Sequence, residues 1–155
     1  MRPVVIVTGA SRGIGAACAR LLARSGNDIA ISYLKDQNAA AGVVRDCVAE
    51  GARATAIQAD VSKEADILHL FQTAERELGL LRALVNNAGI TGGFSRVDSI
   101  QGATLAEVLA VNVTGTILCA REAVKRLSTR HGGRGGAIVN ISSIVARTGG
   151  AGEWV

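Results

Sequence analysis

The chain has 155 residues, enough for about one domain with a real core, and its composition excludes a disordered chain. Hydrophobic residues make up 48% and charged residues 19%, whereas disordered chains combine low hydrophobicity with high charge. The net charge of +4 is modest and mostly dispersed, so we expect no nucleic-acid partner.

Short aliphatic runs alternate with helical segments along the chain. We expect strands at residues 4–8, 28–33, 52–58, 81–86 and 136–142. We expect helices from the glycine-rich turn after the first strand to about residue 25, and at about 37–50, 63–78 and 104–129. Ser62 is the expected cap of the third helix, and Thr104 with Glu107 forms the capping box of the fourth.

This alternation predicts an α/β fold in which a parallel sheet carries helices on both faces, that is, a doubly wound sheet. We expect residues 1–155 to form one domain, because no linker or repeat interrupts them. Sheets of this type usually have six strands. The five that we predict indicate a fold that is incomplete at its C-terminus.

A glycine-rich turn, TGASRGIG, joins the first strand to the first helix. Glycines there allow a tight turn and let backbone N–H groups approach a pyrophosphate, which the positive end of the helix dipole attracts. The spacing is Gx₃GxG rather than GxGxxG, so the motif alone also suits a turn without a ligand. Its place between a strand and a helix favours nucleotide binding.

Five motifs together resemble the short-chain dehydrogenase/reductase family, of the classical type. They are TGASRGIG, Asp60-Val61 after the third strand, the NNAG run at 86–89, Asn112 in the long helix, and the serine-bearing strand ending in Ser142-Ser143. The resemblance covers essentially the whole chain and implies a Rossmann fold that binds NAD(P). The cofactor-binding residues that it implies are Gly9, Ser11, Arg12, Gly13, Ile14, Gly15, Tyr33, Asp60, Val61, Asn87, Ala88 and Gly89.

In the family, the residue matched by Asp60 binds the adenine, with the Val61 backbone alongside. Read from physical chemistry alone, Asp60 is equally a turn residue or a helix cap. The Asn87–Gly89 segment resembles the backbone that lies against the cofactor. Without the resemblance it would be read as support for the sheet, which we expect to be the main task of Asn86.

The second strand ends in Tyr33-Leu34-Lys35, and no acid occurs before Asp36. An acid at that strand end usually binds the ribose 2′-OH of NAD, whereas a nearby arginine accommodates the 2′-phosphate of NADP. Arg12 in the glycine-rich turn can bind such a phosphate with two hydrogen bonds. We therefore expect NADP as the cofactor and regard NAD as the weaker alternative.

Two residues are implied as catalytic. Ser143 matches the serine that polarises the substrate carbonyl, and a hydroxyl donor there would stabilise developing negative charge. Asn112 lies mid-helix among β-branched residues, where asparagine competes with helical hydrogen bonds, so we expect a local distortion that frees a carbonyl group. The family's asparagine holds a water in a proton relay. The alternatives are turn chemistry for the serines and helix packing for Asn112.

The family's proton donor is a tyrosine soon after this serine, followed by a lysine, and neither occurs after Ser143. We therefore expect the N-terminal part of a longer oxidoreductase that transfers a hydride between nicotinamide and a small-molecule alcohol or carbonyl. The chain alone should be inactive. One alternative is a dinucleotide-binding module without catalysis. A methyltransferase of similar fold is disfavoured by the NNAG run and the serine strand.

Other features set expectations about surroundings and partners. Three isolated cysteines and no metal-binding spacing favour reduced thiols, no metal site and a cytoplasmic location. No run of 18 apolar residues occurs, so no membrane span is expected. The resemblance implies a homotetramer for the longer protein. One basic cluster is read as a solvated helix end rather than a nucleic-acid patch: Arg121, Lys125, Arg126, Arg130 and Arg134.

Overall fold

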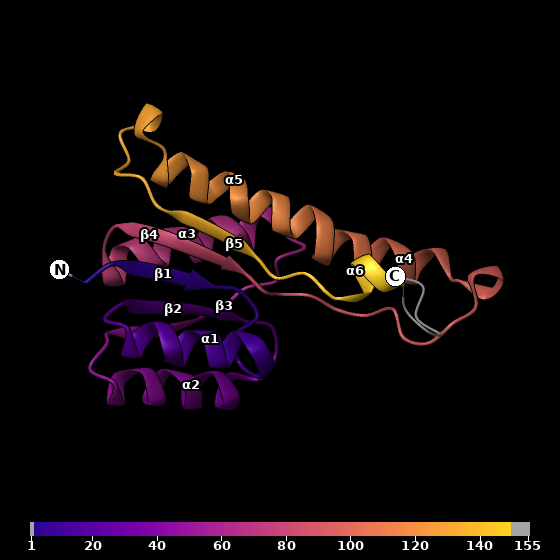
Figure 1. The fold of residues 1–155 in the computed structure, drawn as a ribbon, viewed down its shortest axis with the longest axis horizontal. Helices are drawn as coiled ribbons and strands as arrows, with labels where there is room; N and C mark the ends of the chain where they lie inside the picture. The colour runs from indigo at the N-terminus through magenta and orange to yellow at the C-terminus, as the bar shows by residue number, and fades with distance from the viewer. Residues whose placement is uncertain (1, 150–155) are drawn as a thin grey trace.

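Five aliphatic strands form one parallel sheet in the order β3-β2-β1-β4-β5 (Figure 1). The computed structural model describes residues 2–149. The strands are β1 (Val4–Val7), β2 (Asp28–Tyr33), β3 (Ala54–Gln58), β4 (Leu81–Asn86) and β5 (Ala137–Asn140). The order reverses between β1 and β4, and such a reversal opens a crevice outside the carboxyl ends of the strands. The predicted doubly wound α/β fold is confirmed.

Helices cover both faces of this sheet, as Figure 1 shows. The pair α1 and α2 lies on one face, and α3 and α5 lie on the other. Their bounds are α1 (Gly13–Arg24), α2 (Gln37–Ala49), α3 (Glu64–Leu78), α4 (Gly102–Leu109), α5 (Thr116–Leu127) and α6 (Val145–Thr148). A π-helical segment, Ala110–Gly115, joins α4 to α5 into one continuous rod.

Two predicted helix caps are wrong. Helix α4 begins at Gly102, with Gln101 as its N-cap, so Thr104 and Glu107 already lie inside the helix. The Leu105 N–H bonds the Gln101 carbonyl at 3.1 Å, which starts the helix before Thr104 could cap it. Helix α3 begins after Lys63 without a side-chain cap, because the Ser62 hydroxyl bonds the Asp60 carboxylate instead.

The chain after the serines also differs from expectation. The glycine-rich sequence after Ser143 predicts a loop there, but residues 145–148 form the short helix α6. The rest of the predicted glycine-rich loop, 150–155, lies outside the described residues.

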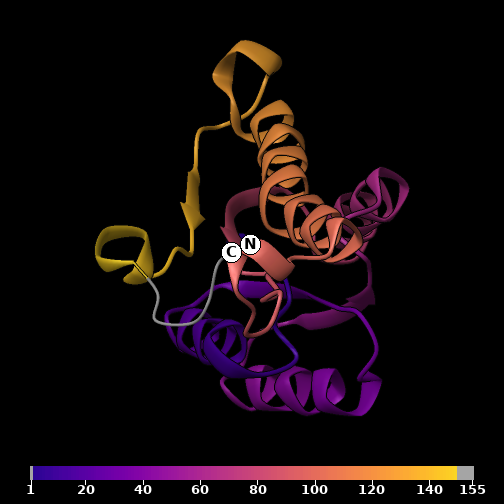
Figure 2. The same ribbon diagram turned by 90° about the vertical axis from the view of Figure 1, so that its right-hand side faces the viewer.

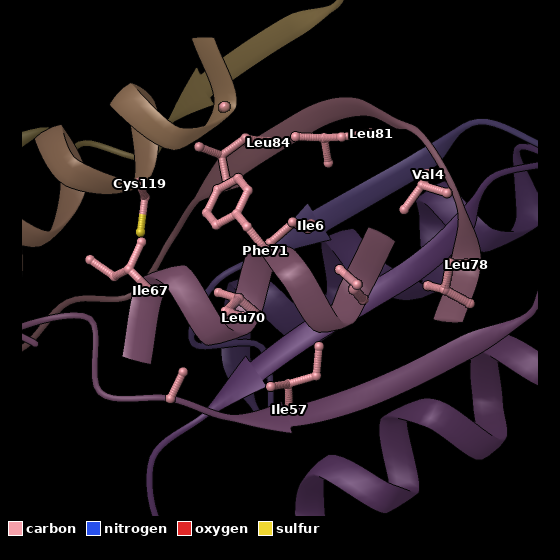
Figure 3. Close-up of a cluster of buried hydrophobic side chains, with 14 of the residues drawn as sticks. Val4, Ile6, Ile57, Ile67, Leu70, Phe71, Leu78, Leu81, Leu84 and Cys119 are labelled. Atoms are coloured by element: carbon pink, nitrogen blue, oxygen red, sulfur yellow. The ribbon is translucent and has the colours of Figure 1, made fainter. Parts of the chain in front are cut away.

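The core consists of two clusters, one on each face of the sheet. Figure 3 shows the cluster beneath α3, where the Phe71 ring lies beside Ile6 and Leu84, all fully buried. Cys119 of α5 joins the same cluster, and Cys47 of α2 lies in the other. Burial first, and then the charge of Glu122, raises the pKa of the Cys119 thiol to about 12, so this thiol stays protonated.

The basic cluster on α5 is largely paired with acids, which our sequence interpretation did not foresee. Glu122 has only 3% of its side chain exposed and binds Lys125 and Arg126, each at 2.8 Å. Arg126 also reaches Glu75 of α3 at 2.8 Å, and Arg121 reaches Glu64 at 2.6 Å. The pairs with Glu75 and Glu64 fasten α5 to α3, whereas the pairs of Glu122 lie within α5 itself.

The rod formed by α4, the π-helical segment and α5 spans Gly102–Leu127 and is long and apolar enough, by length and composition alone, to cross a membrane. Such a result is weak for a single helix, since helices packed within globular proteins meet the same criteria. One side of α5 packs on the sheet through Cys119, Ala123 and Leu127. Along the whole rod, other apolar side chains are exposed: Leu105 and Leu109 of α4, Val113 of the π-helical segment, and Ile117 and Val124 of α5.

Candidate functional site: a dinucleotide cleft beside a serine pocket

The turn after β1 and the turn after β4 are joined by hydrogen bonds at the crevice. The Thr8 hydroxyl accepts hydrogen bonds from the backbone N–H groups of Asn87 and Ala88, both at 3.0 Å. The Asn87 side-chain amide donates back to the Thr8 carbonyl at 2.9 Å and the Gly9 carbonyl at 3.1 Å. The two motifs that we assigned to the cofactor therefore form one unit.

The close approach of these turns explains two glycines. Gly9 has a φ of +62°, and a Cβ added there would lie 2.7 Å from the Ala88 Cα. A Cβ on Gly15 would collide with the Asn87 side chain and would lie 2.9 Å from the Ala10 Cα. A larger residue at either position would push the turns apart.

A cavity of about 340 Å³ opens at this joint. Helix α1 begins beside it, with Arg12 as N-cap, no side-chain cap and no acid in its first turn. The free N–H groups and the helix dipole there suit an anion such as a pyrophosphate. The Ser32 hydroxyl accepts a hydrogen bond from the Gly9 N–H at 3.0 Å and so fixes the start of the turn.

The far end of this cavity is formed by the ends of β2 and β3. Tyr33 and Leu34 contribute from β2, and Ala59, Asp60 and Val61 follow β3. Asp60 lines the cavity, and its carboxylate accepts hydrogen bonds from the Ser62 N–H at 3.0 Å and the Ser62 hydroxyl at 2.6 Å, which supports its reading as a turn residue. Its contact with adenine stays a prediction. Burial alone would raise the pKa of Asp60, but the Ser62 hydrogen bonds and Lys63 outweigh it and lower that pKa.

A second, larger cavity of about 800 Å³ adjoins the first, and Asn87, Ala88, Gly89 and Ile90 line both. Asn112 and the two serines, Ser142 and Ser143, line this second cavity. The residues 87–90 therefore form a wall between the two cavities. The cofactor candidates lie mainly on one side of this wall, and the catalytic candidates lie on the other.

Asn112 lies in the π-helical segment, so the distortion expected from its neighbours is present. Its side-chain oxygen accepts from the Ile90 N–H at 2.9 Å, and its amide donates to the Ile90 carbonyl at 2.8 Å. This pair of bonds ties the rod to the loop after β4. The Asn112 backbone carbonyl accepts a hydrogen bond from the Thr116 hydroxyl at 2.9 Å, so the carbonyl that we expected the distortion to free is bound. The catalytic role of Asn112 stays a prediction.

Ser143 follows β5 by three residues and is exposed to the second cavity. Its hydroxyl oxygen accepts a hydrogen bond from the Val145 N–H at 3.3 Å. Because the N–H supplies that proton, the serine's own hydrogen is left to donate to another oxygen. A hydroxyl held in this way can stabilise negative charge on a carbonyl oxygen.

Comparison with known protein families matches residues 3–155 to the family described as short chain dehydrogenase. The chain belongs to the short-chain dehydrogenase family. A relative from Escherichia coli K12, named "Uncharacterized oxidoreductase YgfF", is 43% identical over 98% of this chain and 62% of its own length. A 3-oxoacyl-[acyl-carrier-protein] reductase from Synechocystis is 35% identical over 97% of this chain and 59% of the relative.

A solved short-chain dehydrogenase/reductase from Serratia marcescens superposes with a TM-score of 0.89 at 30% identity. The superposition covers 97% of this chain and 59% of the Serratia chain. The present chain therefore spans about 60% of the length of these short-chain dehydrogenases. The family and its oxidoreductase class are shown, as is the match to an N-terminal portion.

The structure gathers most of the predicted short-chain dehydrogenase residues in the two cavities. Gly15 lines neither cavity and acts through packing, and Ile14 lies on the second cavity rather than the first. Their individual roles stay predictions. Within residues 2–149, no group of three or more His, Cys, Asp or Glu side chains could hold a metal ion.

Sequence reasoning assigned no role to several polar residues that organise this site. Thr8 stood within the glycine motif, and Ser32 stood next to Tyr33, so position in the motifs could have found both. Thr116 and Asn140 carried no such signal, because their bonds to Asn86 join residues 30 and 54 positions apart in the sequence.

Proposed function

We propose that this chain is the cofactor-binding part of an NADP-dependent oxidoreductase that interconverts an alcohol and a carbonyl. The observation that carries the proposal is the wall shared by the two cavities. A dinucleotide with its pyrophosphate at the start of α1 would extend along Ala88–Ile90, and its nicotinamide end would reach the cavity that holds Ser143.

The bound cofactor would supply or accept the hydride, and the chain's own residues would orient it and the substrate. Gly9, Gly13 and the start of α1 would hold the phosphates, and Asp60 would face the adenine end. Ser143 would donate its hydroxyl hydrogen to the substrate oxygen as charge develops there. The proton donor would come from the rest of the longer protein, where the family places its tyrosine and lysine.

The preference for NADP rests on Arg12 and on the end of β2. Arg12 is exposed at the mouth of the first cavity and forms no ion pair with another described residue. The β2 end offers Tyr33 and Leu34 to that cavity rather than a carboxylate, which would repel a 2′-phosphate.

Calorimetric titration of the chain with NADPH and NADH tests this preference. We expect NADPH to bind at least about ten-fold more tightly, and Arg12→Ala to remove most of that difference while leaving NADH affinity within about two-fold. Arg20→Ala is the matched control, because Arg20 lies on the same helix but pairs with Asp46. Tighter binding of NADH by the wild-type chain would contradict the assignment of NADP.

The isolated chain should not reduce carbonyl compounds with NADPH, because nothing in residues 2–149 supplies the family's tyrosine near Ser143. Tyr33, the only tyrosine in the sequence, is on β2 and lines the other cavity. A spectrophotometric assay with small ketones should show no NADPH oxidation above the background rate. Robust turnover would refute this account of the proton donor.

Two further proposals concern the subunit contact and the cellular location of the longer protein. We propose that the exposed apolar side chains of the Gly102–Leu127 rod form the contact between subunits of a homotetramer of the longer protein. We propose a cytoplasmic location, in keeping with free thiols at Cys18, Cys47 and Cys119. Light scattering of the longer protein and of a Val113→Glu, Ile117→Glu variant tests the contact, since loss of the tetramer is expected.

A dinucleotide-binding module without catalysis is the second candidate. It is favoured by one observation, namely that the described residues of this chain alone complete the first cavity. The two candidates differ in the coding sequence downstream of residue 155. A continuation with the tyrosine and lysine supports the oxidoreductase, and a stop codon supports the module.

A further inference from the structure

Thr116, the first residue of α5, lines the second cavity and belongs to none of the motifs that the sequence analysis assigned to the site. Its hydroxyl donates to the Asn112 carbonyl at 2.9 Å. At the end of the π-helical segment the Thr116 N–H bonds the Val113 carbonyl rather than the Asn112 carbonyl, its partner in a regular α-helix, so the Asn112 carbonyl is open to a side-chain donor. Thr116 supplies that donor.

The backbone carbonyl of Thr116 is also engaged, by a residue on the sheet. The buried side-chain amide of Asn86 donates to the Thr116 carbonyl at 3.2 Å and to the Asn140 side-chain oxygen at 2.9 Å. Asn86 and Asn140 face each other in register at the ends of β4 and β5. The Asn86 carbonyl accepts from the Ile141 N–H at 2.8 Å.

These bonds form one continuous chain across three elements. It runs from Ile90 through Asn112 and Thr116 to Asn86, and from there to Asn140 and Ile141, two residues before Ser143. One end therefore holds the loop beside the proposed cofactor, and the other holds the segment that carries the serine. Rod, sheet and serine segment cannot shift independently while these bonds persist.

We propose that Thr116 is a positioning residue, which fixes the Ser143 segment relative to the loop at Ala88–Ile90 through Asn86 and Asn140. The proposal rests on the proposed function only in giving Ser143 a catalytic purpose; the coupling itself is a property of this chain. A threonine hydroxyl often bonds the carbonyl four residues before it, with local effect only. Here the backbone carbonyl of Thr116 also accepts a hydrogen bond from Asn86, which in turn bonds Asn140. This second bond connects the position of Thr116 to β5.

Amide hydrogen exchange, followed residue by residue by NMR, measures the coupling. The amides of Ile141, Val145 and Ala146 report on the serine segment, since each bonds Asn86 or Ser143. Thr116→Val keeps the shape and removes the hydroxyl. We expect protection at these three amides, and at Ile90, to fall about five-fold, with the amides of α1 and α2 unchanged.

Two further variants separate positioning from general loosening. Thr116→Ser restores the hydroxyl and should restore protection of the three reporter amides to within about two-fold of the wild-type value. Thr114→Val is the same substitution two residues earlier, where the exposed side chain makes no hydrogen bond to a described residue, and it should leave those amides unchanged.

Unchanged exchange at the reporter amides in Thr116→Val, an equal loss of protection over the whole sheet, or failure of Thr116→Ser to restore protection would overturn the proposal. An NADPH titration of the same samples keeps the two proposals apart. A wild-type chain that binds no NADPH would refute the proposed function, while the exchange pattern would still decide the role of Thr116.

Discussion

The inner strands of the sheet and its β5 edge differ sharply in how completely the described residues bury them. Every residue of β1 and β2 is buried, whereas β5 is exposed along most of its length. Strand β5 is the edge strand of the sheet, and Figure 2 shows it at the margin of the molecule, away from α1 and α2. Val139 is 49% exposed, although its partner in register, Val85, is 7% exposed.

This difference separates the two halves of the proposed chemistry. The cofactor half lies beside the packed region, where the turn after β1 is held by hydrogen bonds and close contacts with Asn87 and Ala88. The serine half lies at the exposed β5 edge, where a few hydrogen bonds from Asn86 to Asn140 and Ile141 hold the chain in place. We therefore expect substitutions in the packed region to act mainly on stability, and substitutions near the edge to act locally.

The largest contrast should come from truncating one side chain in each region. Phe71→Ala removes a fully buried ring and should lower the free energy of unfolding by about 3–5 kcal/mol. Val139→Ala at the edge should cost less than about 1 kcal/mol, because the side chain is half exposed already. Urea denaturation of both variants measures the difference. Equal losses would mean that the edge is covered in solution, for instance by another copy.

The glycine turn should be nearly as sensitive as the core. Gly9→Ala combines a positive φ with a Cβ too close to Ala88, so we expect a loss of about 2–3 kcal/mol. Gly13→Ala is the matched control, because its φ is +59° but nothing lies within 4 Å of the added Cβ. It should cost about 1 kcal/mol from backbone strain alone. Thermal unfolding compares them, and a Gly13 variant as unstable as the Gly9 variant would disprove the close-approach argument.

Acid should weaken the ion pairs that Glu122 forms with Lys125 and Arg126 within α5. Burial by itself raises the pKa of Glu122, but hydrogen bonds from Lys125 and Arg126 outweigh it and hold that pKa below its usual value of 4.5. The stabilisation is therefore complete above pH 4.5 and is lost as the pH falls through the lower, folded-state pKa. Glu122→Gln should cost about 2 kcal/mol at neutral pH and less in acid.

Urea denaturation as a function of pH tests the contribution of the Glu122 ion pairs. The difference in stability between wild type and Glu122→Gln should shrink as the pH falls below 4.5. Glu107→Gln is a control on the same rod, because Glu107 forms no ion pair with a described residue. A difference that stays constant with pH would show that the Glu122 charge contributes nothing.

The smallest expected effect has the opposite sign. Gly42 lies inside α2 with a helical backbone, and the nearest atom to an added Cβ is a flexible arginine end 3.8 Å away. Gly42→Ala should therefore stabilise the chain by about 0.5–1 kcal/mol through helix propensity. A higher midpoint of thermal unfolding is expected. A lower midpoint of thermal unfolding would mean that the region around α2 does not tolerate even one added methyl group for which there is space.

Much of the fold could be predicted because hydrophobic period and glycine placement are local signals. The bounds of β2 and β4 match the predicted ones, and the distortion at Asn112 followed from its β-branched neighbours. The caps failed because several nearby residues can start a helix: α4 starts earlier, at the Leu105–Gln101 backbone bond, and the Ser62 hydroxyl bonds Asp60 instead of capping α3. The bonds of Thr116 and Asn140 join residues 30 or more positions apart through Asn86, and no local pattern encodes them.

NMR titration of the isotope-labelled chain with NADP⁺ tests the central claim most directly, namely that this chain by itself forms the dinucleotide site. The account predicts saturable shifts at the amides of Gly9, Gly13, Val61, Ala88 and Gly89, which line the first cavity. Amides at the opposite end of the sheet, such as Gly132 and Gly133, should not move. The absence of saturable shifts, or shifts centred away from the glycine turn, would contradict it.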